Sequence, residues 1–159
     1  MPHVGNLLDD RNRDLIALRP EATTMEAAQA MADRRIGSIV VTDDDGRPLG
    51  IFTERDLMVR VIVAGRDART TRLSDVMTAE LFTAHPAEKA ADVRRAMQER
   101  HIRHVPIVVD GRVIGMLSLR DVLRAVLADK THEVQAIKAY IQGFEDEDSP
   151  SPSERERED

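Results

Sequence analysis

Hydrophobic and polar residues follow the same order along two successive stretches of the chain. Each stretch opens with a short apolar segment, residues 15–18 in the first and 80–84 in the second, and a proline follows within two residues. We expect both segments to be β-strands. Amphipathic helices are predicted next, over residues 23–35 and 88–100, because apolar residues recur there at helical spacing. The stripes expected to face a core are Met25, Ala28 and Met31 in the first helix and Ala90, Val93 and Met97 in the second.

Two β-hairpins are predicted after these helices, over residues 38–54 and 104–119. In each hairpin an Asp-Gly pair separates two apolar runs, which is typical of a tight turn. A further helix is expected to start at the hydroxyl residue that follows each hairpin, Thr53 or Ser118. The order is then β-α-β-β-α twice, an α/β (α+β) fold. Because neither half is long enough to be stable alone, we expect two pseudo-symmetric repeats packed through their sheets.

Residue identities support the duplication. The stretch that begins at Gly50 reads GIFTERDL, and the stretch that begins at Gly115 reads GMLSLRDV, so both share the pattern G-h-h-[ST]-x-x-D. Earlier in each half, proline, alanine, methionine, arginine and isoleucine recur 66 residues apart, from Pro20 to Ile36 in the first half. An internal repeat of this kind indicates one supersecondary unit used twice.

This repeat predicts how the chain is organised. The predicted parts are a first repeat over 4–64, a linker over 65–75, a second repeat over 76–128, a C-terminal helix over 129–144 and a disordered acidic tail over 145–159. The tail is charged and punctuated by serine and proline, with no apolar periodicity. The helix carries Val134, Ile137, Tyr140, Ile141 and Phe144 at helical spacing, a stripe that needs a cover. A homodimer is the simplest cover.

Composition narrows the function. The chain has 159 residues, no cysteine and a net charge of −6. The negative charge argues against binding of DNA or RNA, since phosphate neutralisation calls for a basic face. Without cysteine there is no disulfide framework and no thiolate site, which fits a reducing compartment. No apolar run reaches the length of a membrane span or of a signal peptide core, so we expect a cytoplasmic protein without a membrane partner.

The paired stretches over residues 36–57 and 102–123 resemble a tandem of cystathionine β-synthase (CBS) domains, the arrangement also called a Bateman module. The resemblance covers residues 4 to 127. It implies a regulatory module without chemistry of its own and without a required cofactor. Its two clefts would bind adenosine derivatives such as AMP, ADP, ATP or S-adenosylmethionine, and some members of this family bind NAD-type molecules or show no ligand. Energy sensing and signal transduction to a regulated protein partner would be its roles.

The repeated motif has two interpretations. As a capping box, Thr53 and Ser118 are helix N-caps and the aspartates favour the helix dipole. As a nucleotide grip, Gly50 and Gly115 allow close backbone approach, the hydroxyls meet phosphate or ribose, and Asp56 and Asp121 accept the ribose hydroxyls. The family resemblance assigns these ligand roles too. Arg55 and Arg120, inside the motifs, are either ligand contacts or surface residues.

The halves differ just before their hairpins. The second half has Arg103 and His104 where the first has Gly37 and Ser38. This basic pair resembles the phosphate-binding pair of some nucleotide-sensing CBS proteins, and arginine suits bidentate phosphate contact. The alternative is that both residues face solvent at a polar corner.

The sequence contains no recognisable set of catalytic residues. His101 and His104 lack the further ligands of a zinc site, and the glycines spell neither a Walker loop nor G-x-G-x-x-G. We therefore expect a sensor of an adenosine-containing metabolite that is not an enzyme. The alternatives are an NAD(H)-binding redox sensor and an interaction module without ligand.

Overall fold

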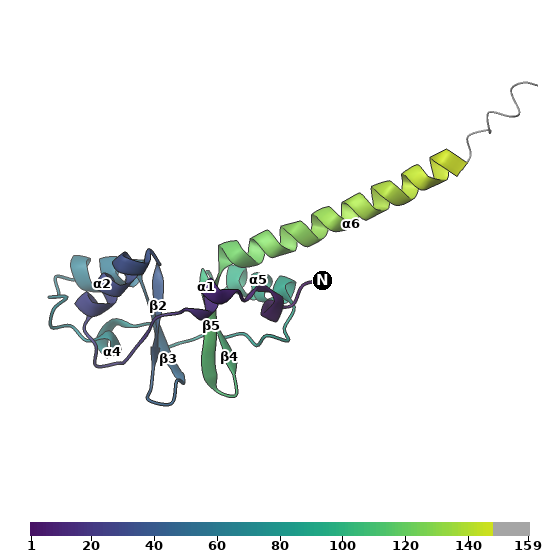
Figure 1. Cartoon of the computed structure of the whole chain (residues 1–159). Coiled ribbons are helices and arrows are strands. Elements are labelled where there is room, and N and C mark those ends of the chain that lie inside the picture. Colours follow the sequence, from purple (N-terminus) through teal and green to yellow (C-terminus); the bar gives the residue numbers. More distant parts are fainter. Residues whose placement is uncertain (148–159) are drawn as a thin grey trace, which may run out of the picture.

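The two predicted repeats form two halves that lie side by side, and a long helix leaves the second half (Figure 1). The structure is a computed structural model that describes residues 1–147, with side chains described to residue 142. Of the predicted acidic tail, residues 148–159 lie outside the described residues, whereas 145–147 belong to the long helix. Within residues 1–147, no helix combines the length and apolar character needed to cross a membrane.

The first half is built on a three-stranded sheet. Its strands are β1 (Ala17–Leu18), β2 (Ser38–Thr42) and β3 (Pro48–Thr53), with β1 parallel to β2 and β2 antiparallel to β3. The helix α2 (Thr24–Arg34) joins β1 to β2. After β3, a short α3 (Glu54–Asp56) runs directly into a π-helical segment, η2 (Leu57–Val63). The predicted order of elements is confirmed in this half.

The second half repeats the helix and the hairpin. Its elements are α5 (Ala90–Glu99), β4 (His104–Val109), β5 (Arg112–Ser118) and α6 (Leu119–Glu147). The turn residues Asp110 and Gly111 both adopt left-handed backbone conformations, with φ of 51° and 77°. Two-residue hairpin turns require such angles, and an Asp-Gly pair tolerates them. The helix predicted over 129–144 is therefore not a separate element, because α6 continues without a break from the end of β5.

The strand predicted over residues 80–84 is wrong. Only Ala84 pairs there, in a single parallel bridge to Ile107, so the second sheet has two strands. In the first half the Val40 N–H donates to the Ile16 carbonyl at 3.2 Å. The position that matches Val40 is Pro106, which has no N–H to donate. One proline thus ends the pairing that would have made a third strand.

The stripe predicted for the first helix is also partly wrong. The buried residues of α2 are Thr24, Ala27 and Met31, whereas the side chain of Met25 is 41% exposed. The linker causes this rotation, because the Thr24 N–H donates to the Thr71 carbonyl and the Thr24 hydroxyl donates to the Ala68 carbonyl. In α5 the predicted residues Ala90, Val93 and Met97 are all buried.

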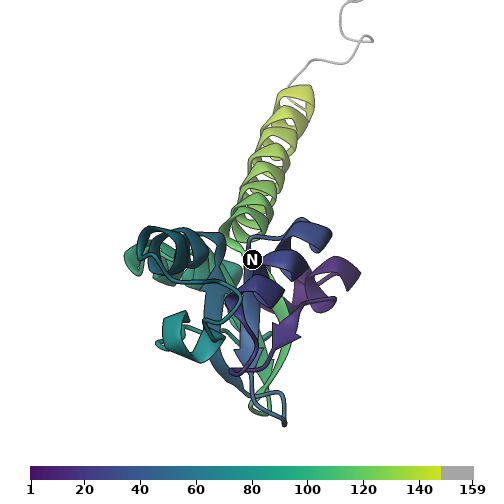
Figure 2. The ribbon, with the colours of Figure 1, turned by 90° about the vertical axis from the view of Figure 1, so that its left-hand side faces the viewer.

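The start of the chain and the end of the linker each complete one of the two cores. The N-terminal turn η1 (Val4–Leu7) packs on the second half, where Val4 is fully buried and its N–H donates to the Glu88 carbonyl at 2.8 Å. The linker helix α4 (Leu73–Val76) packs into the core of the first half. Figure 2, viewed from the first half, shows α6 leaving on the far side of the body. Each core is thus completed by a segment that precedes or follows its repeat.

The two hairpins lie next to each other between the outer helices (Figure 1). The Val113 N–H donates to the Gly46 carbonyl at 3.0 Å, so the two hairpin ends are joined by a backbone hydrogen bond. Val40, fully buried, belongs to the central strand of the first sheet. This side-by-side placement brings the two G-h-h-[ST]-x-x-D motifs onto the same central region of the molecule.

Candidate functional site

Both motifs form capping boxes. The Asp56 N–H donates to the Thr53 hydroxyl and the Thr53 N–H donates to the Asp56 carboxylate, both at 3.1 Å. In the second half the Asp121 N–H donates to the Ser118 hydroxyl at 3.2 Å and the Ser118 N–H donates to the Asp121 carboxylate at 3.1 Å. The structural interpretation of the motif is therefore realised twice. It leaves one carboxylate oxygen, Oδ1, of each aspartate outside the box.

The second of these aspartates faces a cleft. We call this the Ser118 cleft; it has a volume of about 320 Å³ and is lined by Arg11, Asn12, Asp14, Leu15, Ile16, Arg35, Ile36, Gly37, Ser38, His104, Met116, Ser118, Arg120, Asp121 and Arg124. The Asp121 side chain is 20% exposed, and its Oδ1 lies 3.8 Å from the Arg11 guanidinium. Asn12 donates to the other oxygen at 3.4 Å. The carboxylate therefore sits among donors and remains accessible.

The first aspartate is held differently. Asp56 Oδ1 lies 3.6 Å from Arg60 Nε, and the Asp56 side chain is 13% exposed. The Arg60 guanidinium also donates to the carbonyls of Val76 and Met77, at 3.0 and 3.1 Å. Asp56 is thus paired with an arginine that is itself held in place by the end of the helix α4. This arrangement does not support the predicted ribose contact of Asp56.

A second cleft lies beside the first motif. We call it the Thr53 cleft; it has a volume of about 890 Å³ and is lined by Gly37, Ile51, Thr53, Glu54, Arg55, Met58, His101, Ile102, Arg103 and His104. The predicted contacts Thr53 and Arg55 are therefore together in one cleft. A third hollow, the outer hollow, has a volume of about 610 Å³ and is lined by Arg103, His104, Ser118, Leu119, Arg120, Leu123, Arg124 and Leu127.

The residues before each hairpin line hollows of both halves. Gly37 lines both clefts, Ser38 lines the Ser118 cleft, and Arg103 lines the Thr53 cleft and the outer hollow. We expected Arg103 to mark a charged cleft, and the structure places it beside the first motif in the Thr53 cleft and beside Ser118 and Arg120 in the outer hollow. The reason is the side-by-side packing of the hairpins, which leaves each corner between the two motifs. His104 lines both clefts and the outer hollow.

The pKa of His104 is lowered. Burial is the main cause, and nearby Arg103 adds to it, while the negative charges of Glu54 and Asp121 oppose the shift. A histidine with a lowered pKa is neutral at pH 7. His104 is therefore an uncharged group that lines both clefts, and the expectation that it binds phosphate as a cation loses support.

The two motif glycines make room for the chain itself. A Cβ atom at Gly50 would lie 2.5 Å from Met77 Sδ and 3.0 Å from the Thr78 carbonyl oxygen. One at Gly115 would lie 3.0 Å from Leu8 Cδ2 and 3.1 Å from the Asn12 carbonyl oxygen. The close approach expected from the sequence is present, but other segments of the chain provide it. Neither glycine lines the two clefts, so their contact with a ligand stays a prediction.

Several cleft residues were missed by the sequence analysis. They are Arg11, Asn12, Arg35, Glu54, His101 and Arg124. Arg11 and Asn12 belong to the helix α1 (Asp10–Arg13), which reaches the second motif only through tertiary packing. Arg124 follows Asp121 by three residues, one helical turn, and that spacing was a usable signal. Among the described residues, no group of three or more histidine, aspartate or glutamate side chains could hold a metal ion.

Comparison with known proteins identifies relatives along most of the chain. A CBS domain family model matches residues 4–62 and 73–128. The CBS domain-containing protein CBSX3, mitochondrial, of Arabidopsis thaliana is 38% identical over 125 residues, which are 76% of this chain and 61% of that protein. This chain therefore spans about three fifths of the length of that relative.

Solved structures share the fold. A CBS-domain containing protein from Agrobacterium tumefaciens is 36% identical, with a TM-score of 0.70 over 77% of this chain and 98% of that one. The CBS domain pair of protein MJ0100, in complex with 5′-methylthioadenosine and S-adenosyl-L-methionine, is 25% identical, with a TM-score of 0.71 over 81% of this chain and 98% of that one. Paired domains of this kind are therefore the architecture of the chain.

Proposed function

The chain belongs to the CBS domain family as a tandem pair, and we propose that it is a regulatory module that binds an adenosine-containing nucleotide. The ligand is AMP, ADP, ATP or S-adenosylmethionine. Occupancy of the clefts is relayed to a regulated protein partner, and the module itself does not catalyse a reaction. The relative MJ0100 supports this proposal, because its CBS domain pair is in complex with two adenosine derivatives.

The accessible carboxylate of Asp121 carries the proposal. A carboxylate can accept hydrogen bonds from both hydroxyls of a ribose, as the acidic residue of dinucleotide-binding folds does. Four arginines line the same cleft: Arg11, Arg35, Arg120 and Arg124. Guanidinium groups form charge-assisted, often bidentate hydrogen bonds to phosphate. The Ser118 cleft thus offers one acceptor for the sugar and several donors for an anion.

The Thr53 cleft suits the anionic part of a ligand better than a ribose. Arg55 and Arg103 line it, and its acidic lining residue is Glu54. Asp56 would have to leave Arg60 before it could accept a ribose hydroxyl. We infer that the Ser118 cleft is the main nucleoside site and that the Thr53 cleft binds a second anionic ligand more weakly.

An NAD(H)-binding sensor is the second candidate. One observation favours it: Gly37 and His104 line both clefts, so the two clefts adjoin. A dinucleotide has two nucleosides joined by a pyrophosphate and could extend from one cleft into the other. A module without ligand is the third candidate. We further propose that the protein acts as a cytoplasmic homodimer.

Titration calorimetry on the full chain with adenosine, AMP, S-adenosylmethionine and NADH tests the proposal. Asp121→Asn is expected to weaken binding of adenosine and AMP about 10- to 100-fold, because one charge-assisted hydrogen bond is lost. Asp56→Asn is the matched control. It makes the same change in the equivalent capping box of the first half, where the aspartate is paired with Arg60. Equal losses in the two variants would contradict the ribose assignment.

A second pair of titrations separates sugar from phosphate. Arg120→Gln should reduce affinity for AMP several-fold more than affinity for adenosine, because adenosine lacks the phosphate that a guanidinium would bind. Tighter binding of NADH than of AMP, lost in Asp121→Asn and also in Arg103→Gln, would favour the dinucleotide. No heat with any of the four compounds would favour the module without ligand.

A further inference from the structure

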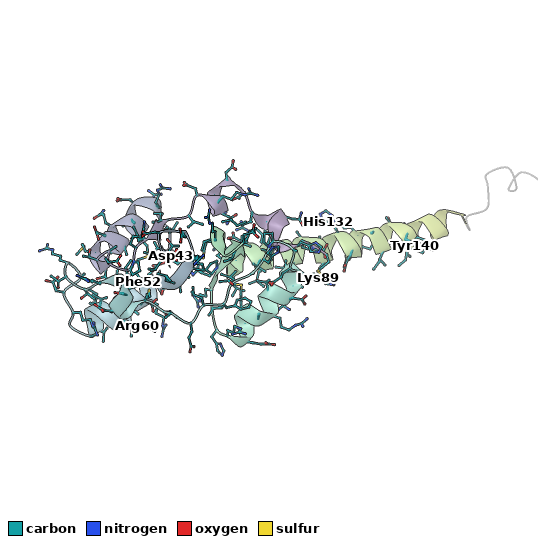
Figure 3. All side chains as sticks on the ribbon, turned by 90° about the horizontal axis from the view of Figure 1, so that it is seen from below. Asp43, Phe52, Arg60, Lys89, His132 and Tyr140 are labelled. Carbon is teal, nitrogen blue, oxygen red and sulfur yellow. The ribbon has the colours of Figure 1, made fainter. Side chains whose placement is uncertain are left out.

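The second half of α6 has no contact with a folded core. The helix spans 29 residues, about 43 Å at 1.5 Å per residue. Every residue from 130 to 142 is exposed. Figure 3 shows His132 at the edge of the folded body and Tyr140 on the part of the helix that extends beyond it. Because the helix extends beyond the body, the described part of the same chain cannot cover this section.

Apolar residues on α6 follow a heptad pattern. Successive residues along one face of the helix are separated alternately by four and by three positions. These residues are Leu123, Leu127, Lys130, Val134, Ile137 and Ile141. Leu127, Val134, Ile137 and Ile141 are between 51% and 64% exposed. A seam with this alternation corresponds to positions a and d of a coiled coil, with Leu127, Val134 and Ile141 at a. Such a seam fits another helix of the same kind.

The charges beside the seam specify how two copies pair. Glu133 falls at position g and Lys138 at position e of the next heptad. In a parallel, in-register pair of helices, g of one helix faces the following e of the other, so Glu133 meets Lys138 twice. In an antiparallel pair, e faces e and g faces g. The e positions of the described part, Arg124, Thr131 and Lys138, then offer no opposite charge to one another.

Lys130 lies within the seam, at position d, and its ammonium group is 3.1 Å from Glu133 of the same helix. A single polar residue in a coiled-coil seam lowers stability but fixes the register, because other registers leave it against apolar residues. In the parallel arrangement each Lys130 keeps Glu133 as its partner. The pattern of one lysine among apolar residues therefore specifies one alignment.

From this seam we propose that two copies of the chain associate through α6 as a parallel, in-register, two-stranded coiled coil. The inference deepens the homodimer of the proposed function but does not depend on nucleotide binding. The seam begins in the body, where Leu123 and Leu127 line the outer hollow beside Arg103 and Arg120. Association would thus bring a second copy to the edge of the clefts.

Sedimentation equilibrium of the full chain over a range of concentrations tests whether the seam is the interface. Ile137→Lys is expected to raise the dimer dissociation constant roughly 100-fold, because one apolar contact per chain is lost and a charge is buried. Ala139→Lys, at position f on the outer face, adds the same side chain to the same helix and should leave the constant unchanged. A monomeric wild type, or equal effects of both variants, would overturn the proposal.

The orientation is tested by cross-linking, because the chain has no cysteine of its own. In the parallel pair, Ile141→Cys forms a disulfide with its own counterpart under mild oxidation. In the antiparallel pair centred on the seam, Ile141→Cys instead cross-links to Lys130→Cys in a mixture of the two variants. Self-cross-linking of Ile141→Cys supports the proposal, and cross-linking only in the mixture overturns the parallel arrangement.

Charge exchange gives an independent readout. A mixture of Glu133→Lys and Lys138→Glu chains should form heterodimers in preference to either homodimer. The first variant carries lysine at both the g and the e position and the second carries glutamate at both, so the g–e′ pairs repel in each homodimer and attract in the heterodimer. Random mixing would overturn the parallel pairing. Thermal denaturation of these variants in the presence of AMP then reports nucleotide binding separately, so failure of one proposal does not hide failure of the other.

Discussion

The two motifs of this protein carry the same pattern and the same capping box, yet only one aspartate faces a cleft. Asp56 is paired with Arg60, four residues further along its helix, at 3.6 Å. The residue four positions after Asp121 is Ala125, which has no charge to offer. The shared motif therefore fixes a helix start. Whether its carboxylate is available to a ligand depends on the arginine beside it, because Arg60 is held by the Val76 and Met77 carbonyls whereas the Arg11 side chain next to Asp121 is 76% exposed.

The largest effect is expected from exchanging the residue at which the two sheets differ, which is Val40 in the first and Pro106 in the second. Val40→Pro removes the N–H that bonds the Ile16 carbonyl in a buried strand, and it should lower the free energy of unfolding by roughly 3 kcal/mol. Pro106→Val is the matched change in the other half. It restores an N–H but frees the unfolded chain, so it should change the free energy of unfolding by less than about 1 kcal/mol.

Urea denaturation of both variants measures this difference, and hydrogen exchange at residue 106 reports whether the new N–H is bonded. If Pro106→Val destabilised the protein as much as Val40→Pro, the proline would not be the reason for the missing third strand.

A smaller effect should follow from changing Ala125, the residue four positions after Asp121. Ala125→Arg places a guanidinium one turn after Asp121, as Arg60 stands after Asp56, and the new pair should compete with the ligand. Affinity for adenosine is expected to fall about tenfold. Ala125→Gln adds a long side chain without charge and should cost less affinity. Equal losses in a calorimetric titration of the two variants would indicate a steric effect instead.

The smallest effect concerns pH. The pKa of His104 is lowered, chiefly by burial, so the unfolded chain binds a proton more readily than the folded chain. His104 adds no pH dependence well above its unfolded pKa of about 6.5, and stability should fall as the pH drops below that value. Glu54, Asp121 and Arg103 face the imidazole, and their charges are included in this direction.

Replacement of His104 by glutamine should therefore flatten the decline of melting temperature between pH 7 and about 5.5, relative to the wild type. Differential scanning at several pH values measures the two slopes. A steeper slope in the variant would show that the histidine gains a proton on folding, contrary to the direction stated here.

The elements that could be predicted are those encoded by local patterns. Helical periodicity predicted the helices α2 and α5, and Asp-Gly turns predicted both hairpins, because these signals act within a few residues. The strand over 80–84 failed because its fate depends on a proline in another strand. The rotated stripe of α2 likewise depends on the linker, which bonds Thr24 from more than 40 residues away.

The clefts were only partly predictable for the same reason. Ser118 and Asp121 lie within one motif, but Asn12, which bonds Asp121, is 109 residues away in the sequence. The engagement of Asp56 by Arg60 was readable, since i and i+4 are neighbours on a helix. The placement of Arg103 was not, because it follows from how two hairpins pack, and no local pattern specifies that.

The position of Val4 affects how fast the second core can form. Val4 is buried beside Glu88, 84 residues further along the chain. The second core is therefore complete only when these two distant segments have met. Closing so long a loop slows folding, since its entropic cost precedes the contacts that offset it. The second half is thus expected to complete its core more slowly than a hairpin whose contacts are local.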